Sequence, residues 1–149
     1  MIEVRPFTRG DREQLARLVN AHVAAAMPGA SVPTATLLND LERPIGEYVV
    51  GPWVTDMATL VVVEGDRIVA GAHLRRYGGE EGISESYRDA GEITWLVCWP
   101  DHLQAGRALT EAALEQLARW QVRICYGDGT LPAPGVFGGS AHETEKIVR

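Results

Sequence analysis

The sequence predicts a mixed α/β (α+β) fold with a mostly antiparallel central sheet flanked by helices and ending after a fifth strand. Two β-branched runs, 59–63 and 68–74, are separated by four residues and predict a hairpin. Residues 91–119 have the pattern of a buried strand, a short loop and an amphipathic helix. The run 122–126 follows that helix, so we expect it to lie parallel to the strand before the helix.

Composition favours one domain spanning residues 1–149. A chain of 149 residues with 46% hydrophobic content can bury a real core. The net charge of −6, with both signs interleaved, argues against nucleic-acid and anionic-membrane partners. No apolar run approaches the ~20 residues of a membrane span, and Met1–Arg5 does not resemble a signal peptide, so we expect a cytoplasmic protein.

Metal and disulfide chemistry are not indicated. Cys98 and Cys125 both fall in predicted strands, where a small buried side chain is the simpler interpretation. The four histidines have no metal-ligand spacing. We therefore expect no metal.

The first part of the chain predicts a strand followed by a helix. Residues 2–5 alternate as a short strand, and Thr8 precedes Asp11 with the spacing of a helix start. The helix should end near Met27. Its buried face should consist of Leu15, Leu18, Val19 and Val23.

Three further segments have weaker signals. Residues 31–43 predict a second, shorter helix ended by Pro44. The aromatic stretch from Tyr48 to Trp53 is interpreted as packing. The polar, glycine-rich segment 75–90 predicts a surface loop, and a role near a site or none are equally open.

The central segment combines a strand with a helix start suited to anions. Small residues at Ala105, Gly106 and Ala108 let a ligand approach the backbone, and unpaired N–H groups at a helix N-terminus attract phosphate. On the preceding strand, strict alternation predicts one face with Glu92, Thr94, Leu96 and Cys98 and another with Ile93, Trp95, Val97 and Trp99.

This segment resembles the GNAT superfamily of acyl-CoA-dependent N-acetyltransferases. The family has a pyrophosphate loop of the form (Gln or Arg)-x-x-Gly-x-(Gly or Ala), and Gly106 and Ala108 match its last two fixed places. Leu103 stands where Gln or Arg is expected. Gln104 and Arg107 are close enough to replace the lost polar group.

The resemblance implies a co-substrate and roles for named residues. The co-substrate would be acetyl-CoA, and the acceptor a small-molecule or peptide primary amine. Glu92 resembles the family's general base, and burial can raise a carboxyl pKa toward neutrality. In the family, two parallel strands separate around the pantetheine arm. Backbone N–H groups would hold pantetheine and polarise the thioester at Leu96, Val97 and Cys98, and would hold pyrophosphate at Gln104, Ala105, Gly106, Arg107 and Ala108.

The resemblance covers residues 1–127. The segment 128–149 predicts an irregular tail, without the family's later helix, its tyrosine general acid or its final strands. The alternative is therefore a catalytically weak or inactive GNAT-fold domain that binds acyl-CoA or serves in assembly. An unrelated α/β domain is a third possibility. With no later strand to cover 122–126, an apolar edge would stay open, which favours a homodimer or else a fragment that depends on a partner.

Overall fold

The computed structural model describes residues 1–31, 33, 35–36, 41 and 53–127. Most of the helix predicted over 31–43, the stretch 48–52 and the tail 128–149 therefore lie outside the described residues. In chain order the elements are β1 (Ile2–Pro6), the 3-10 turn η1 (Arg9–Asp11), α1 (Arg12–Ala26), β2 (Val54–Glu64), β3 (Arg67–Tyr77), β4 (Ala90–Cys98), α3 (Leu103–Arg119) and β5 (Ile124–Gly127).

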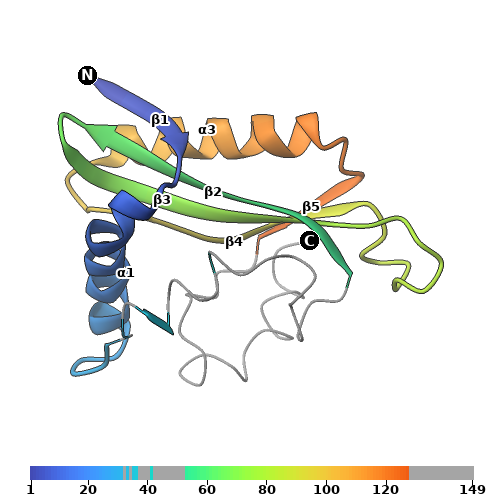
Figure 1. Cartoon of the computed structure of the whole chain (residues 1–149), viewed down its shortest axis with the longest axis horizontal. Coiled ribbons are helices and arrows are strands. Elements are labelled where there is room, and N and C mark those ends of the chain that lie inside the picture. Colours follow the sequence, from blue (N-terminus) through green and yellow to red (C-terminus); the bar gives the residue numbers. More distant parts are fainter. Residues whose placement is uncertain (32, 34, 37–40, 42–52, 128–149) are drawn as a thin grey trace.

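The described strands form one sheet in the order β1-β2-β3-β4-β5. The first three pairings are antiparallel, and only β4 and β5 run parallel. The helices α1 and α3 cover opposite faces of this sheet (Figure 1). The predicted mixed sheet, its mostly antiparallel pairing and the parallel last strand are confirmed.

The β2–β3 hairpin is longer and tighter than the sequence pattern indicated. Glu64 pairs with Arg67, so the turn contains only Gly65 and Asp66, and the predicted four-residue connection is wrong. Gly65 has φ of 67°, a conformation that glycine adopts without a steric penalty. At the far end β3 continues to Tyr77, because polar residues can extend a strand wherever a neighbouring strand pairs with them.

The start of α1 is held by an ion pair. The Arg5 guanidinium donates to both carboxylate oxygens of Asp11, at 2.7 and 2.8 Å. The same carboxylate accepts the Thr8 N–H at 2.8 Å, as the Thr8–Asp11 spacing predicts. The hydrogen bond from Arg5 holds the pKa of Asp11 below its usual range. Strand β1 is thereby tied to the first turn of the helix.

Helix α1 packs on the face of β3 and β4. Its predicted buried residues, Leu15, Leu18, Val19 and Val23, are all fully buried, and they cluster with Trp95 and Val97 of β4. A Cβ on Gly71 would lie 2.7 Å from Leu15 Cδ1, so glycine permits this close approach.

Helix α3 covers the other face. The predicted stripe of Leu109, Ala113 and Leu117 is buried, together with Ala105. Leu109 and Ala113 pack against Leu60 and Val62 of β2 and against small residues of β3. The helix therefore lies along the sheet, with its N-terminus beyond the end of β4.

Candidate active site

A β-bulge in β4 changes which side chains share a face. In the pairing with β3, Leu74 lies opposite Ile93 and His73 lies opposite Trp95, so Thr94 is an extra residue without a partner. An extra residue interrupts the two-residue alternation of a strand. After Thr94, the side chains of β4 therefore point to the opposite face from the one that unbroken alternation from Glu92 would give them.

The predicted grouping of faces on β4 is wrong for this reason. Leu96 and Cys98 pack with Ile93 on the α3 side of the sheet. Glu92 lies opposite Arg75 and, like Trp95, belongs to the other face. Glu92 therefore does not share a face with Leu96 and Cys98.

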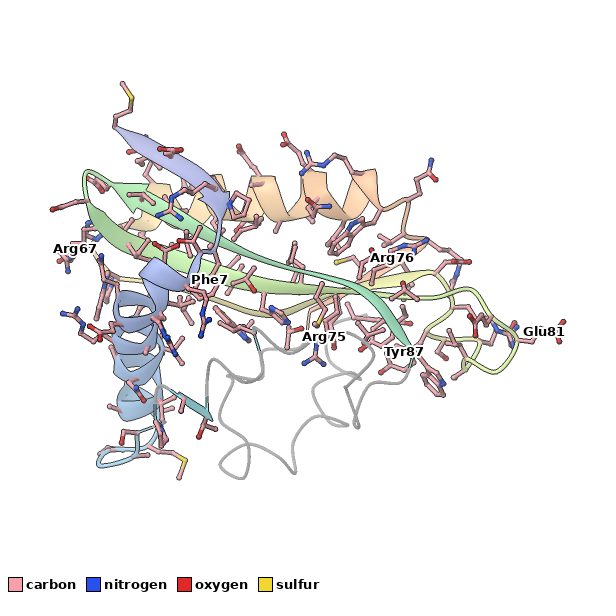
Figure 2. All side chains as sticks on the ribbon, viewed as in Figure 1. Phe7, Arg67, Arg75, Arg76, Glu81 and Tyr87 are labelled. Carbon is pink, nitrogen blue, oxygen red and sulfur yellow. The ribbon has the colours of Figure 1, made fainter. Side chains whose placement is uncertain are left out.

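Glu92 is a buried carboxylate with a defined hydrogen-bond donor. Only 4% of the residue is exposed, and the Tyr77 hydroxyl donates to Glu92 Oε2 at 2.8 Å. In register, Glu92 lies between Arg75 of β3 and Tyr126 of β5. Figure 2 shows Arg75 and Arg76 on opposite sides of the sheet, and the Arg76 Nε group donates to the Trp120 carbonyl at the end of α3. Arg75 is thus the arginine on the Glu92 face.

Burial shifts the pKa values of the groups around Glu92. It raises the pKa of Tyr77, and the Glu92 charge and hydrogen bond raise it further. Burial and the Glu92 charge likewise raise the pKa of the Cys125 thiol. His73 is 2% exposed, and burial, together with the Arg75 charge, lowers its pKa to about 3. His73 is thus neutral, with Nδ1 2.8 Å from the Thr59 hydroxyl.

An aromatic cluster supports Tyr77. The Tyr87 ring contacts Tyr77 edge-on with centroids 5.0 Å apart, and it also packs against Tyr126 at 5.4 Å and Trp53 at 6.3 Å. The Tyr126 hydroxyl donates to the Ser86 carbonyl at 2.7 Å. The segment after β3 is thereby fixed against the end of the sheet that carries Glu92.

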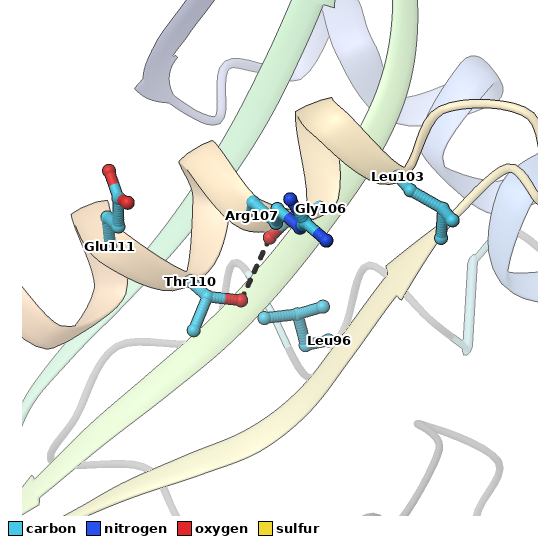
Figure 3. Close-up of a pocket in the computed structure, with 6 residues that line it drawn as sticks. All are labelled: Leu96, Leu103, Gly106, Arg107, Thr110 and Glu111. Atoms are coloured by element: carbon cyan, nitrogen blue, oxygen red, sulfur yellow. Dashed lines mark hydrogen bonds between the residues drawn. The ribbon is translucent and has the colours of Figure 1, made fainter.

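An open groove of about 470 Å³ lies on the α3 side, between β4 and the first turns of α3 (Figure 3). Leu103, at the helix start, is 67% exposed. The Thr110 hydroxyl donates to the Gly106 carbonyl at 2.8 Å. The groove is lined by Leu96, Leu103, Gly106, Arg107, Thr110 and Glu111.

At the N-terminus of α3, the first backbone N–H groups have no intrahelical partner. His102 is the N-cap residue, its side chain makes no capping hydrogen bond, and the first turn contains no acidic residue. The Gly106 N–H donates to the His102 carbonyl at 3.1 Å, so helical pairing has begun there. The N–H groups of residues 103–105 precede that first intrahelical bond. Three donors and the positive end of the helix dipole thus meet beside the groove.

The other predicted cofactor residues lie around this groove. Val97 is buried in the core against α1, and Cys98 packs against Gly106. Gln104 and Ala105 line a second groove of about 450 Å³ with His102 and Glu64, and Ala108 lines a third of about 410 Å³ near β1. Of the predicted side chains, the first groove brings together Leu96, Gly106 and Arg107.

Two kinds of residue escaped the sequence interpretation. Thr110 and Glu111 continue the helical stripe that begins at Leu103, at spacings of seven and eight, and this period could have revealed them. Tyr77 follows Arg75 and Arg76, whose polarity predicts a surface loop and not a strand. Its alternation with His73 and Arg75 was the available signal.

Within the described part of the chain, no group of His, Cys, Asp and Glu side chains could hold a metal ion. No helix found there is long and apolar enough to cross a membrane.

Comparison with solved structures identifies the fold. An acetyltransferase from Trypanosoma brucei matches with a TM-score of 0.60 and 21% identity, over 99% of this chain and 91% of that one. A ribosomal-protein-alanine N-acetyltransferase from Brucella melitensis matches with a TM-score of 0.64 and 16% identity, over 95% of this chain and 82% of that one. The PaiA N-acetyltransferase from Thermoplasma acidophilum was solved with coenzyme A. It matches with a TM-score of 0.58 and 16% identity, over 85% of this chain and 78% of that one.

The chain has the fold of the GNAT acetyltransferases. No protein-family model matches the sequence. No curated protein sequence matches it either. Function must therefore be argued from the site itself.

Proposed function

We propose that this protein is an acetyl-CoA-dependent N-acetyltransferase acting on a primary amine. The observation that carries the proposal is the groove between β4 and α3, in which Leu96, Gly106 and Arg107 meet beside the free N–H groups of the helix start. The fold shared with acetyltransferases, one of them solved with coenzyme A, supports the same assignment.

Pyrophosphate would bind at the N-terminus of α3. The N–H groups of residues 103–105 and the helix dipole favour an anion, and Arg107 adds a positive charge on the groove side. Gly106 exposes backbone without a side chain, so a ligand can come close. Leu103 contributes only apolar contact, so we expect weaker binding than a polar residue there would give.

The thioester would lie along the free side of β4. The Trp99 N–H donates to the Val69 carbonyl of β3 at 3.0 Å, so by alternation the N–H groups of Leu96 and Cys98 point away from β3. On that side the described pairing with β5 covers Ala90–Ile93 only. These N–H groups are available to pantetheine amides and to the thioester carbonyl, where they would stabilise the developing oxyanion.

Glu92 would act as the general base. An ammonium group is not a nucleophile, so its proton must leave before the nitrogen attacks. The nitrogen would then attack the thioester carbon of acetyl-CoA, the C–N bond would form as the C–S bond breaks, and coenzyme A would leave as a thiolate that takes a proton from solvent. The carboxylate is buried, so little bulk water competes for its oxygens. Glu92 would accept the proton directly or through one water molecule.

A catalytically weak or inactive domain that binds acyl-CoA or serves in assembly is the second candidate. The observation that favours it is Leu103, which stands where a polar side chain is expected in the pyrophosphate loop. Measurement of acetyl transfer separates the two candidates, because only the enzyme predicts turnover, and coenzyme A binding separates a binding role from an assembly role.

A homodimer is part of the proposal. Strand β5 is the last strand of the described sheet and has no partner strand on its outer side among the described residues; a strand edge of this kind pairs readily with another chain. Light scattering at micromolar concentration should give twice the chain mass of 16.2 kDa. A stable mass near that of one chain would contradict the dimer.

Thermal unfolding with and without acetyl-CoA tests the proposed function first. Ligand at ~100 times its dissociation constant should stabilise the folded state by ~2.7 kcal/mol. Release of the coenzyme A thiol, followed with a panel of amines, then tests transfer. No thermal shift at millimolar acetyl-CoA would mean that the groove is not a cofactor site.

A further inference from the structure

We propose that Tyr77 is a positioning residue for Glu92: its hydroxyl binds Oε2 and fixes the orientation of the carboxylate that receives the acceptor proton. This inference rests on the proposed function and extends it to a residue of β3. The geometry behind it is the 2.8 Å hydrogen bond from Tyr77 Oη to Glu92 Oε2.

The sheet register brings the two side chains together. Arg75 is the direct partner of Glu92, and Tyr77 lies two residues further along β3 on the same face. Neighbours at this diagonal spacing lie within reach of an aromatic side chain. The hydroxyl therefore reaches the carboxylate from the end of β3, without any change in the backbone.

Tyr77 is itself held in place from several directions. It pairs with Val54 of β2, and the next residue, Gly78, donates its N–H to the Trp53 carbonyl at 3.0 Å. Its ring packs edge-on against Tyr87. Because the Tyr77 hydroxyl is held in place, its hydrogen bond also holds the Glu92 carboxylate in one orientation.

Fixing the carboxylate has a chemical consequence. A glutamate side chain has three rotatable bonds, and ordering them before the reaction removes an entropic cost from the proton transfer. A hydrogen bond donated to a carboxylate also favours its ionised form. Because the pKa of Tyr77 is raised, the hydroxyl keeps its proton and remains the donor.

Among the described residues, the other titratable groups near Glu92 come from β3, from β5 and from the segment between β3 and β4. From β3, Arg75 is a cation and His73 is neutral. From β5, Cys125 keeps its proton because its pKa is raised, and the Tyr126 hydroxyl donates to Ser86. From the segment between β3 and β4, Tyr87 contributes its ring. Substitution of Tyr77 therefore removes a neutral hydrogen-bond donor to Glu92 without changing a charge beside the carboxylate.

The substitution Tyr77→Phe tests the proposal, with Tyr87→Phe as the matched control. The Tyr87 hydroxyl is buried and has no hydrogen-bond partner among the described residues, so the control removes the same atom from the neighbouring ring. Tyr77→Phe should lower kcat roughly tenfold and leave the KM for acetyl-CoA unchanged. The rising limb of its kcat/KM profile should move to higher pH. In a Glu92→Gln background, Tyr77→Phe should have no further effect.

A titration independent of activity completes the test. Carbon-13 NMR of labelled glutamate carboxyls, with Glu92→Gln identifying the resonance, should show Glu92 titrating at higher pH in Tyr77→Phe than in the wild type. Transfer by the wild type, with unchanged titration and pH profiles in Tyr77→Phe, would overturn the positioning role alone. Absence of transfer by the wild type, with the NMR shift present, would overturn the proposed function and this role with it.

Discussion

Gly106 of α3 lies directly against Cys98 of β4: a Cβ on Gly106 would come within 3.2 Å of Cys98 Sγ. That distance is tighter than ordinary van der Waals contact, so the two elements meet at a point where only a hydrogen fits comfortably. Beside this contact the helix backbone borders the groove. Packing and ligand access therefore depend on the same glycine.

A double substitution separates these two roles of Gly106. Gly106→Val should abolish the acetyl-CoA-dependent rise in melting temperature, because the side chain fills the place where the ligand meets the backbone. It should also destabilise the fold by roughly 1–3 kcal/mol through overpacking. Adding Cys98→Ala should restore part of that stability without restoring binding. Denaturant unfolding and ligand-dependent melting measure the two effects, and a Gly106→Val protein that binds acetyl-CoA normally would contradict the proposed site.

Leu103→Arg should tighten coenzyme A binding. The new guanidinium would stand at the exposed start of α3, where pyrophosphate is proposed to bind, and one charge-assisted hydrogen bond is worth about 1.5–3 kcal/mol, a tenfold or larger gain in affinity. Leu114→Arg is the control, because Leu114 is an exposed leucine of the same helix outside the groove. Isothermal titration compares them. Equal affinities in the two variants would place the pyrophosphate elsewhere.

Glu92→Gln should lower acetyl transfer by about 10² or more with little change in coenzyme A affinity. The amide keeps the size of the side chain and can still accept the Tyr77 hydroxyl, but it cannot take up the ammonium proton. Steady-state turnover and coenzyme A titration measure the two quantities. An unaltered rate would assign proton removal to solvent or to another group.

Stability should fall in mildly acidic solution because of His73. Its folded-state pKa of about 3 lies below its ordinary 6.5, so the unfolded chain binds the proton first. The stability that neutral His73 contributes is therefore fully present above pH 6.5. It is lost as the pH falls toward 3, and the free energy of unfolding then changes by about 1.4 kcal/mol per pH unit. His73→Asn should flatten this slope in urea unfolding between pH 7 and 5. Parallel slopes in the wild type and His73→Asn would show that other groups dominate.

The parts of the fold that the sequence predicted are those encoded by local periodicity. The buried stripe of α3 and the face of α1 with Leu15 and Leu18 follow from helical spacing alone. The length of the β2–β3 hairpin does not, because Arg75 and Arg76 are polar and gain their strand conformation from pairing with neighbours. Strand ends are set by tertiary partners that no local pattern contains.

The sequence predicted the part of the candidate site that matches a motif. It did not predict the part that depends on the β-bulge in β4. Gly106 and Arg107, which the loop pattern singled out, line the groove, and their role in binding pyrophosphate stays a prediction. The hydrogen bond from Tyr77 to Glu92 joins residues that are 15 positions apart in the sequence and lie on two different strands. It depends on the exact register of β3 against β4, which no local pattern contains. One unpaired residue, Thr94, was enough to reverse the predicted face of Leu96.

The bulge at Thr94 also means that β4 carries one residue more than its pairing with β3 uses. Without Thr94, Ile93 and the residue after it would stand opposite Leu74 and His73 in unbroken succession, and every side chain of β4 would keep its present face. Thr94 should accordingly be a rare position in a central strand at which a deletion leaves the core intact. Such a shortened chain would change the local backbone course between Glu92 and Leu96, and with it the position of the Glu92 carboxylate relative to the N–H groups of Leu96 and Cys98.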